Sequence, residues 1–90
     1  HAAREAQGHR ASAFSQVSLM SRYATKSATL ELAGLGQRAQ SAFASATDLG
    51  TGLERPLRLQ RGVAEGSVTA QLDDCPARTL LRIYWPLEQG

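Results

Sequence analysis

The sequence predicts an α+β fold in which a long N-terminal helix packs on a small three-stranded antiparallel sheet. Small or apolar residues recur at helical spacing between Ala24 and Leu53, and three short runs between Leu57 and Trp85 alternate like strands. Glycines and a proline separate these patterns just after Thr47. We therefore expect a single domain over residues 1–90, with a helical part at 1–47, a connecting loop at 48–56 and an antiparallel β-meander at 57–87.

The helical part is predicted from the spacing of its small and apolar residues. They recur every three or four positions, which keeps them on one side of a helix, whereas a strand would need strict alternation. No proline occurs from Ala2 to Thr47, and alanine, glutamine and arginine are frequent there. The residues of this seam are Ala24, Ala28, Leu32, Leu35, Ala39, Ala42, Ala46, Leu49 and Leu53.

The predicted helix is too long for its own domain to cover. At about 1.5 Å per residue, a helix of about 45 residues is roughly 65 Å long. Either it projects and packs against other subunits, or it breaks into two helices that pack on each other. Gly34 and Gly36 form the best break, since each glycine costs about 1 kcal/mol in a helix, and Ser21 to Ser27 is a second weak point. Leu35 stays in phase with its neighbours, which favours a continuous helix.

The seam is mainly alanine, which lets another backbone approach closely but buries little apolar area. Partners are therefore expected to supply part of the helix's stability, and Phe14, Met20 and Phe43 are expected to pack in the ordinary core. The predicted partner-binding residues are Ala28, Leu32, Leu35, Ala39 and Ala42.

Three runs in the second half alternate in the manner of strands, at residues 57–60, 68–72 and 80–85. The links between them are too short for crossover helices, so neighbouring runs should pair in antiparallel fashion. In the last run, Leu81, Ile83 and Trp85 share the face that should meet the helix. Tyr84 is predicted on the opposite face.

Charge suggests a second class of function. Lys and Arg exceed Asp and Glu by ten to eight, and nine of the ten basic residues are arginine. The small, scattered excess fits ordinary surface charge. The alternative is a small basic binding module for nucleic acid or another acidic partner. It would use Arg55, Arg58, Arg61, Arg78 and Arg82 on or beside the sheet. Arg58 and Arg82 would share an exposed surface with Tyr84, which could stack on bases.

Residues that could carry catalysis or bind a metal are few and poorly placed. His1 and His9 are the only histidines, and both lie near the N-terminus. A lone Cys75 can form neither an internal disulfide nor, by itself, a zinc site. Asp73 and Asp74 fit a turn better than a calcium loop, which needs six or more oxygen ligands. We predict that the domain is not an enzyme and holds no cofactor or metal.

The order of the predicted elements resembles the soluble part of a type IV pilin-like protein, either a minor pilin or a type II secretion minor pseudopilin. The resemblance lies in the long helix with its small-residue seam, the loop around Gly50 and Gly52, and the final meander. Many pilins have a pair of cysteines in the C-terminal part, whereas this chain has a single cysteine, Cys75. In that family the helix continues backwards into a membrane-spanning segment, and a start at His1 is expected to reflect its removal.

The resemblance implies a non-enzymatic structural or assembly subunit of a bacterial filament or secretion system. Its partners would be other protein subunits, bound through the N-terminal helix. Its location would be the periplasm or the cell surface. Contact with the membrane would occur only through an N-terminal segment absent from this chain.

Overall fold

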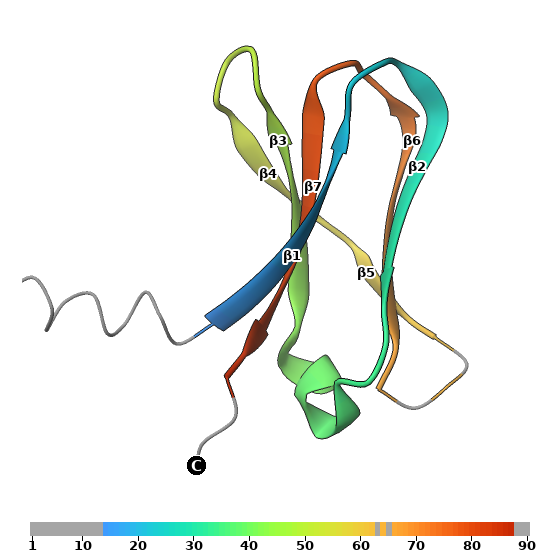
Figure 1. Cartoon of the computed structure of the whole chain (residues 1–90), viewed down its shortest axis with the longest axis vertical. Coiled ribbons are helices and arrows are strands. Elements are labelled where there is room, and N and C mark those ends of the chain that lie inside the picture. The colour runs from blue at the N-terminus through green and yellow to red at the C-terminus, as the bar shows by residue number, and fades with distance from the viewer. Residues whose placement is uncertain (1–13, 63, 65, 88–90) are drawn as a thin grey trace, which may run out of the picture.

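Strands dominate the computed structural model, which describes residues 14–62, 64 and 66–87 (Figure 1). A 3₁₀ helix, η1 (Gly36–Ser41), is the one helical element in that part of the chain. The strands are β1 (Phe14–Ser21), β2 (Thr25–Leu32), β3 (Phe43–Asp48), β4 (Glu54–Leu57), β5 (Leu59–Arg61), β6 (Val68–Cys75) and β7 (Thr79–Pro86).

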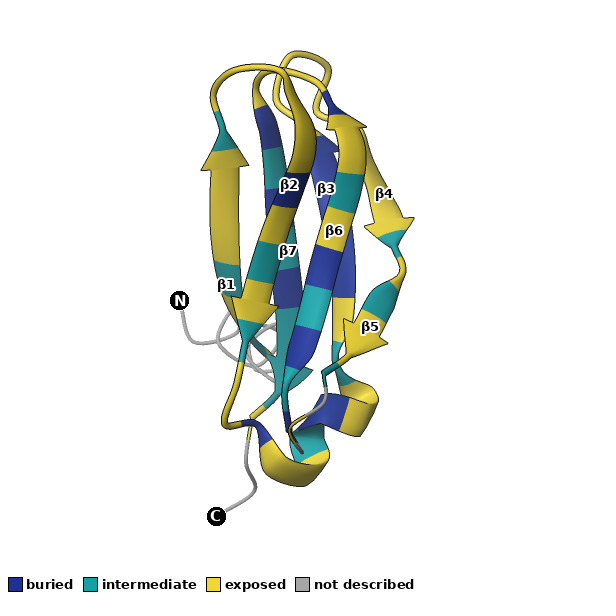
Figure 2. Ribbon diagram, turned by 90° about the vertical axis from the view of Figure 1, so that its right-hand side faces the viewer, coloured by how far each residue is buried: buried dark blue, intermediate teal, exposed yellow. Residues whose placement is uncertain are grey.

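The strands form two antiparallel sheets that face each other as a β-sandwich (Figure 2). The four-stranded sheet has the order β1-β7-β3-β4, and the three-stranded sheet has the order β2-β6-β5. Alternate residues of each strand point between the sheets, which is where apolar side chains escape water. The fold is therefore all-β over the described residues.

The predicted α+β fold with a long N-terminal helix is wrong. Residues 14–21 and 25–32 are the strands β1 and β2, and the predicted start of the helix, at residues 1–13, lies outside the described residues. Alanine at helical spacing buries little area, and its helix propensity is worth only tenths of a kcal/mol per residue. Antiparallel pairing with the hydrophobic strands β7 and β6 outweighs that preference, because it satisfies the backbone and covers the inward side chains.

The seam of the predicted helix is dispersed in the structure. Gly34 and Gly36 adopt positive φ angles of 83° and 61°. Gly34 lies between β2 and the 3₁₀ helix, and Gly36 is the first residue of that helix. Leu49 and Leu53 are 36% and 71% exposed at the turn between β3 and β4. The element order that resembles a pilin-like protein is therefore missing from the described residues.

The predicted loop and meander are only partly right. The segment at 48–56 contains a hairpin turn and most of β4, not a link between helix and sheet. Strands β5 and β6 pair in antiparallel fashion as expected. The predicted pairing of β6 with β7 is wrong, because residues 76–78 carry the chain from the three-stranded to the four-stranded sheet.

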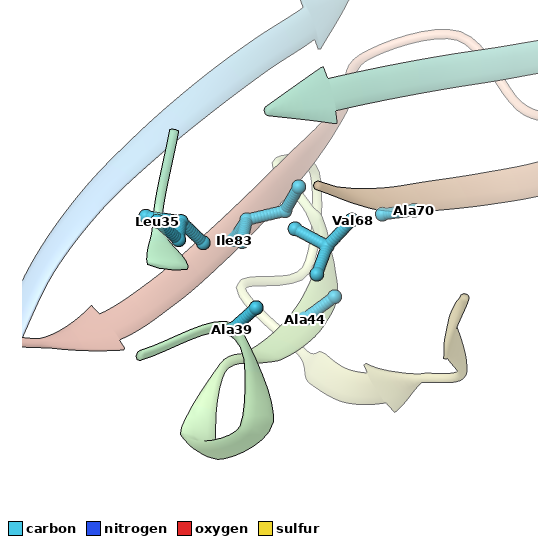
Figure 3. Close-up of a cluster of buried hydrophobic side chains, with 6 residues drawn as sticks. All are labelled: Leu35, Ala39, Ala44, Val68, Ala70 and Ile83. Carbon is cyan, nitrogen blue, oxygen red and sulfur yellow. The ribbon is translucent and has the colours of Figure 1, made fainter. Parts of the chain in front are cut away.

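The core lies between the two sheets, where small side chains pack against a few large ones. Ile83 and Val68 are fully buried, and the alanines beside them let the two backbones approach (Figure 3). The predicted faces of the last strand are confirmed for Leu81 and Ile83, which are both fully buried. The main cluster consists of Leu35, Ala39, Ala44, Val68, Ala70 and Ile83, and a second consists of Ala28, Ala46, Cys75 and Leu81.

One side of the sandwich is closed by the chain itself. Only Arg58 separates β4 from β5, so this segment passes from one sheet directly into the other. Arg61, at the end of β5, donates hydrogen bonds from Nη1 to the Ala39 carbonyl at 2.6 Å and from Nη2 to the Gln40 carbonyl at 3.3 Å. These bonds tie the 3₁₀ helix to the three-stranded sheet.

Shortening Ile83 tests the inner face of β7. We expect Ile83→Ala to lower the free energy of unfolding by about 2–5 kcal/mol, because it leaves a cavity in the main cluster. Thr29→Ala, on the exposed side of β2, should cost less than about 1 kcal/mol. Urea unfolding of both variants measures the difference, and equal costs would show that the faces are assigned wrongly.

Substitution of Gly66 tests whether its backbone lies close to the backbone of Gly36. Its φ is +82°, and a Cβ there would lie 2.5 Å from the Gly36 backbone nitrogen. Gly52 has a similar φ of +79° but no heavy atom within 4 Å of the corresponding position. We expect Gly52→Ala to cost about 1–2 kcal/mol through conformation alone.

Gly66→Ala should cost about 1–3 kcal/mol more than Gly52→Ala, because the backbone must also shift to admit the methyl group. Chemical denaturation of the two variants gives the comparison. A Gly66→Ala protein that is as stable as the Gly52→Ala protein would contradict the close approach.

Candidate functional site

The two outward faces of the sandwich differ in chemistry. The three-stranded sheet presents polar side chains to solvent: Ser27, Thr29, Glu31, Gln60, Thr69, Gln71 and Asp73. The outer face of the four-stranded sheet carries aromatic and other apolar side chains over a polar network. The second face is therefore the candidate site.

Three aromatic side chains gather on this outer face, and we call them the aromatic row: Phe14 of β1, Phe43 of β3 and Tyr84 of β7. The rings of Phe14 and Phe43 meet edge to face with centroids 5.6 Å apart. Phe43 stacks on Tyr84 at 4.8 Å, with only 13° between the ring planes. Phe14 and Phe43 are nevertheless 43% and 47% exposed. The row thus leaves a large apolar area in contact with water.

A polar network lies beside the aromatic row and shares Tyr84 with it. Arg82 Nη1 donates to the Tyr84 hydroxyl at 2.9 Å, and that hydroxyl donates to Glu54 Oε2 at 3.2 Å. Ser45 Oγ donates to the same carboxylate oxygen at 2.6 Å. These bonds connect β7, β3 and β4, so they hold the Tyr84 ring in position before any partner binds.

The network favours the ionised form of Glu54, and the charge of Arg82 is one of the causes. The hydrogen bond from Ser45 lowers the pKa of Glu54 below its usual value; burial opposes this, while the Tyr84 hydroxyl and the Arg82 charge assist it. Two buried polar atoms of this sheet, Thr47 Oγ1 and Arg82 Nε, have no hydrogen-bond partner among the described residues. The face therefore combines apolar area with a locally compensated charge pair.

The predicted acidic-partner surface is only partly assembled. Arg82 and Tyr84 are hydrogen-bonded neighbours on the outer face of the four-stranded sheet. Arg58 lies at the crossing from β4 to β5 and has no hydrogen bond to this pair within the described residues. Because Glu54 is the acceptor for Tyr84, a carboxylate lies where an acidic partner would approach.

The predicted partner-binding residues of the helix seam do not form a surface. Leu35 and Ala39 are buried in the main cluster, and Ala28 is buried in the second. Leu32 and Ala42 pack against the main cluster and are partly buried. The prediction placed them on a helix face that binds other subunits, but strand β2 and the 3₁₀ helix with its two flanking residues, Leu35 and Ala42, direct them towards the core.

The prediction missed the aromatic row because it assigned Phe14 and Phe43 to the core of a helical domain. The strand alternation of β1 is the signal that could have found it: Val17 and Leu19 oppose Ile83 and Leu81, which leaves Phe14 on the other face. Met20 lies on the same face as Phe14 and is 46% exposed.

Several clefts lie on the molecule, and one of them, near the turn between β3 and β4, adjoins the candidate site through Glu54. Its volume is about 430 Å³, and Arg55 is its only basic lining residue. Within residues 14–62, 64 and 66–87, no group of three or more His, Cys, Asp and Glu side chains could hold a metal ion. His1 and His9 lie outside the described residues. The polar residues that line the cleft are Asp48, Glu54, Arg55 and Thr79.

No helix in the described part of the chain is both long enough and apolar enough to cross a membrane. The periplasmic or cell-surface location stays a prediction.

Comparison of the chain with known family models, curated proteins and solved structures finds no significant match. The function is therefore inferred from the geometry of this chain alone.

Titration of Glu54 tests the polar network. Because the folded-state pKa is lowered, the stability that Glu54 contributes is present above its unfolded pKa and is lost as pH falls through the folded value. We expect Ser45→Ala to raise the pKa of Glu54, and to raise it more than Tyr84→Phe does, because the Ser45 bond is the largest cause. Carboxyl-detected NMR gives the pKa directly.

Ser27→Ala is the matched control for that titration, since Ser27 hydrogen-bonds to Gln71 on the other sheet. It should leave the pKa of Glu54 unchanged. An unchanged pKa in the Ser45→Ala protein would show that the serine hydroxyl does not hold this carboxylate.

Proposed function

We propose that the chain is a non-enzymatic assembly subunit that binds another protein through the outer face of its four-stranded sheet. The observation that carries this proposal is the aromatic row of Phe14, Phe43 and Tyr84. The sequence also predicts binding to other protein subunits, so the proposed partner is of the same kind. The proposed binding surface differs, because it is a sheet face and not a helix seam.

Exposed aromatic rings favour protein binding for a physical reason. Aromatic side chains are enriched at the centres of protein interfaces, because each buries a large apolar area at a small cost in side-chain entropy. Soluble domains rarely leave several large apolar side chains together on one face. Phe43 is 47% exposed although it is stacked on Tyr84, so an approaching surface could still cover much of its ring.

The polar network favours a partner that is not strongly charged. Phosphate binding relies on basic groups whose charge is free to replace counterions. Arg82 instead bonds to Tyr84, and Tyr84 bonds to the ionised Glu54. A protein surface that is neutral or of mixed charge can pack on the aromatic rings and hydrogen-bond to the Tyr84 hydroxyl. The phosphate backbone of a nucleic acid would be repelled by the Glu54 carboxylate.

Site-specific photo-cross-linking in cells that naturally produce the protein tests this proposal. A photoreactive phenylalanine analogue at Phe43 should give a discrete cross-linked product that contains a second polypeptide, identified by mass spectrometry. Phe43 suits the probe because the replacement keeps an aromatic ring at an exposed position.

The matched control carries the same analogue at Thr29, which is exposed on the outer face of the three-stranded sheet. It should give no such product. If neither position gives a discrete product, or if both give the same products in equal yield, the outer face of the four-stranded sheet is not a specific binding surface.

A further inference from the structure

Strand β1 is an open edge of the four-stranded sheet. It pairs with β7 through eight consecutive residue pairs, from Phe14 with Pro86 to Ser21 with Thr79, so no bulge interrupts it. None of its eight residues is buried. Figure 2 shows β1 at the margin of the sandwich, with no described strand beyond it. Within the described residues, no strand pairs with the outward backbone groups of β1.

The other edges carry features that discourage pairing. Strand β4 has four residues and includes Pro56, and β5 has three residues and ends at Arg61. Strand β2 is as long as β1 but carries Lys26 and Glu31. Short length, proline and charge are the usual ways in which proteins prevent edge-to-edge association. Strand β1 has none of them, since its sequence contains neither proline nor a charged residue.

We propose that β1 pairs in antiparallel fashion with β1 of a second copy of this chain, with a two-fold axis at Val17. The two four-stranded sheets then form one continuous sheet of twice the width. This interface goes beyond the proposed function, because it is formed by the edge of the sheet and shares only Phe14 with the aromatic row on the outer face. With the axis normal to the sheet, the aromatic rows of both copies face the same side.

The side chains of β1 complement one another in this register. Phe14 lies opposite Met20 of the second copy, and both are exposed in the single chain at 43% and 46%. A thioether beside an aromatic ring is a favourable contact, and directly opposite residues have Cβ atoms about 5 Å apart. Gln16 lies opposite Ser18, which pairs a hydrogen-bonding amide with a hydroxyl. Each of these pairs occurs twice by symmetry.

The inward side of the strand also favours a second copy. Leu19 opposes the fully buried Leu81 in β7, yet it remains 39% exposed because it lies at the open edge. In the proposed register Ser15 of the second copy lies opposite Leu19, and the paired strand covers it. A charged edge could not take this place without losing solvation, so the neutral β1 matches another β1 better than it matches β2, β4 or β5.

Charge exchange at the edge tests the dimer. The full chain is measured by analytical ultracentrifugation over a range of concentrations, and it is expected to dimerise. Gln16→Lys with Ser18→Lys places like charges opposite each other twice, which should weaken dimerisation about tenfold. Mixing this protein with the Gln16→Glu, Ser18→Glu protein should restore a dimer. Both positions are exposed, so the substitutions spare the core.

The control variant is Ser27→Lys with Thr29→Lys, which puts two charges at the same spacing on β2. It should leave dimerisation unchanged. Amide hydrogen exchange of the unaltered chain gives an independent measurement, in which β1 amides gain protection as concentration rises and β2 amides do not. A chain that stays monomeric at millimolar concentration, or a β2 control as disruptive as the β1 change, would overturn the proposal.

Discussion

Burial of Leu81 and Ile83 on the inner face of β7 is the constraint on which the other features depend. Both side chains are fully buried, and β7 is the strand that pairs with both β1 and β3. Because successive residues of a strand point to opposite faces, this burial directs Arg82 and Tyr84 outwards. The core and the candidate site are therefore two faces of one strand, and a shift of one residue in register would exchange them.

Small residues opposite β7 explain how the sandwich closes around these two side chains. Ala44 and Ala46 pair with Ile83 and Leu81 in the neighbouring strand, and Ala70 lies in the facing sheet. Alanine contributes little hydrophobic free energy by itself, but it lets large neighbours fill the space between the sheets without strain. Ala46, which belongs to the predicted helix seam, is thus one of the small partners in a two-sheet core.

The site could be predicted only in part because its members come from distant segments. Arg82 and Tyr84 lie two residues apart, and their shared outward direction follows from the alternation of the last strand. Phe43 and Glu54 come beside them only when β3 and β4 pair next to β7. No spacing within the sequence encodes that neighbourhood, and the helical interpretation of residues 1–47 placed Phe14 and Phe43 in the core.

The sequence by itself determined the strand character of residues 68–72 and 80–85 and the inward direction of Leu81 and Ile83, whereas it favoured a continuous helix through Gly34 and Gly36, where the structure has positive φ angles. The properties predicted correctly are local ones, set by the alternation of apolar and polar residues. Tertiary structure alone decided that residues 14–21 and 25–32 are strands and that β6 and β7 belong to different sheets. The reason is that alanine- and serine-rich segments have weak local preferences, so the partner that covers their apolar side chains and pairs their backbone chooses between helix and strand.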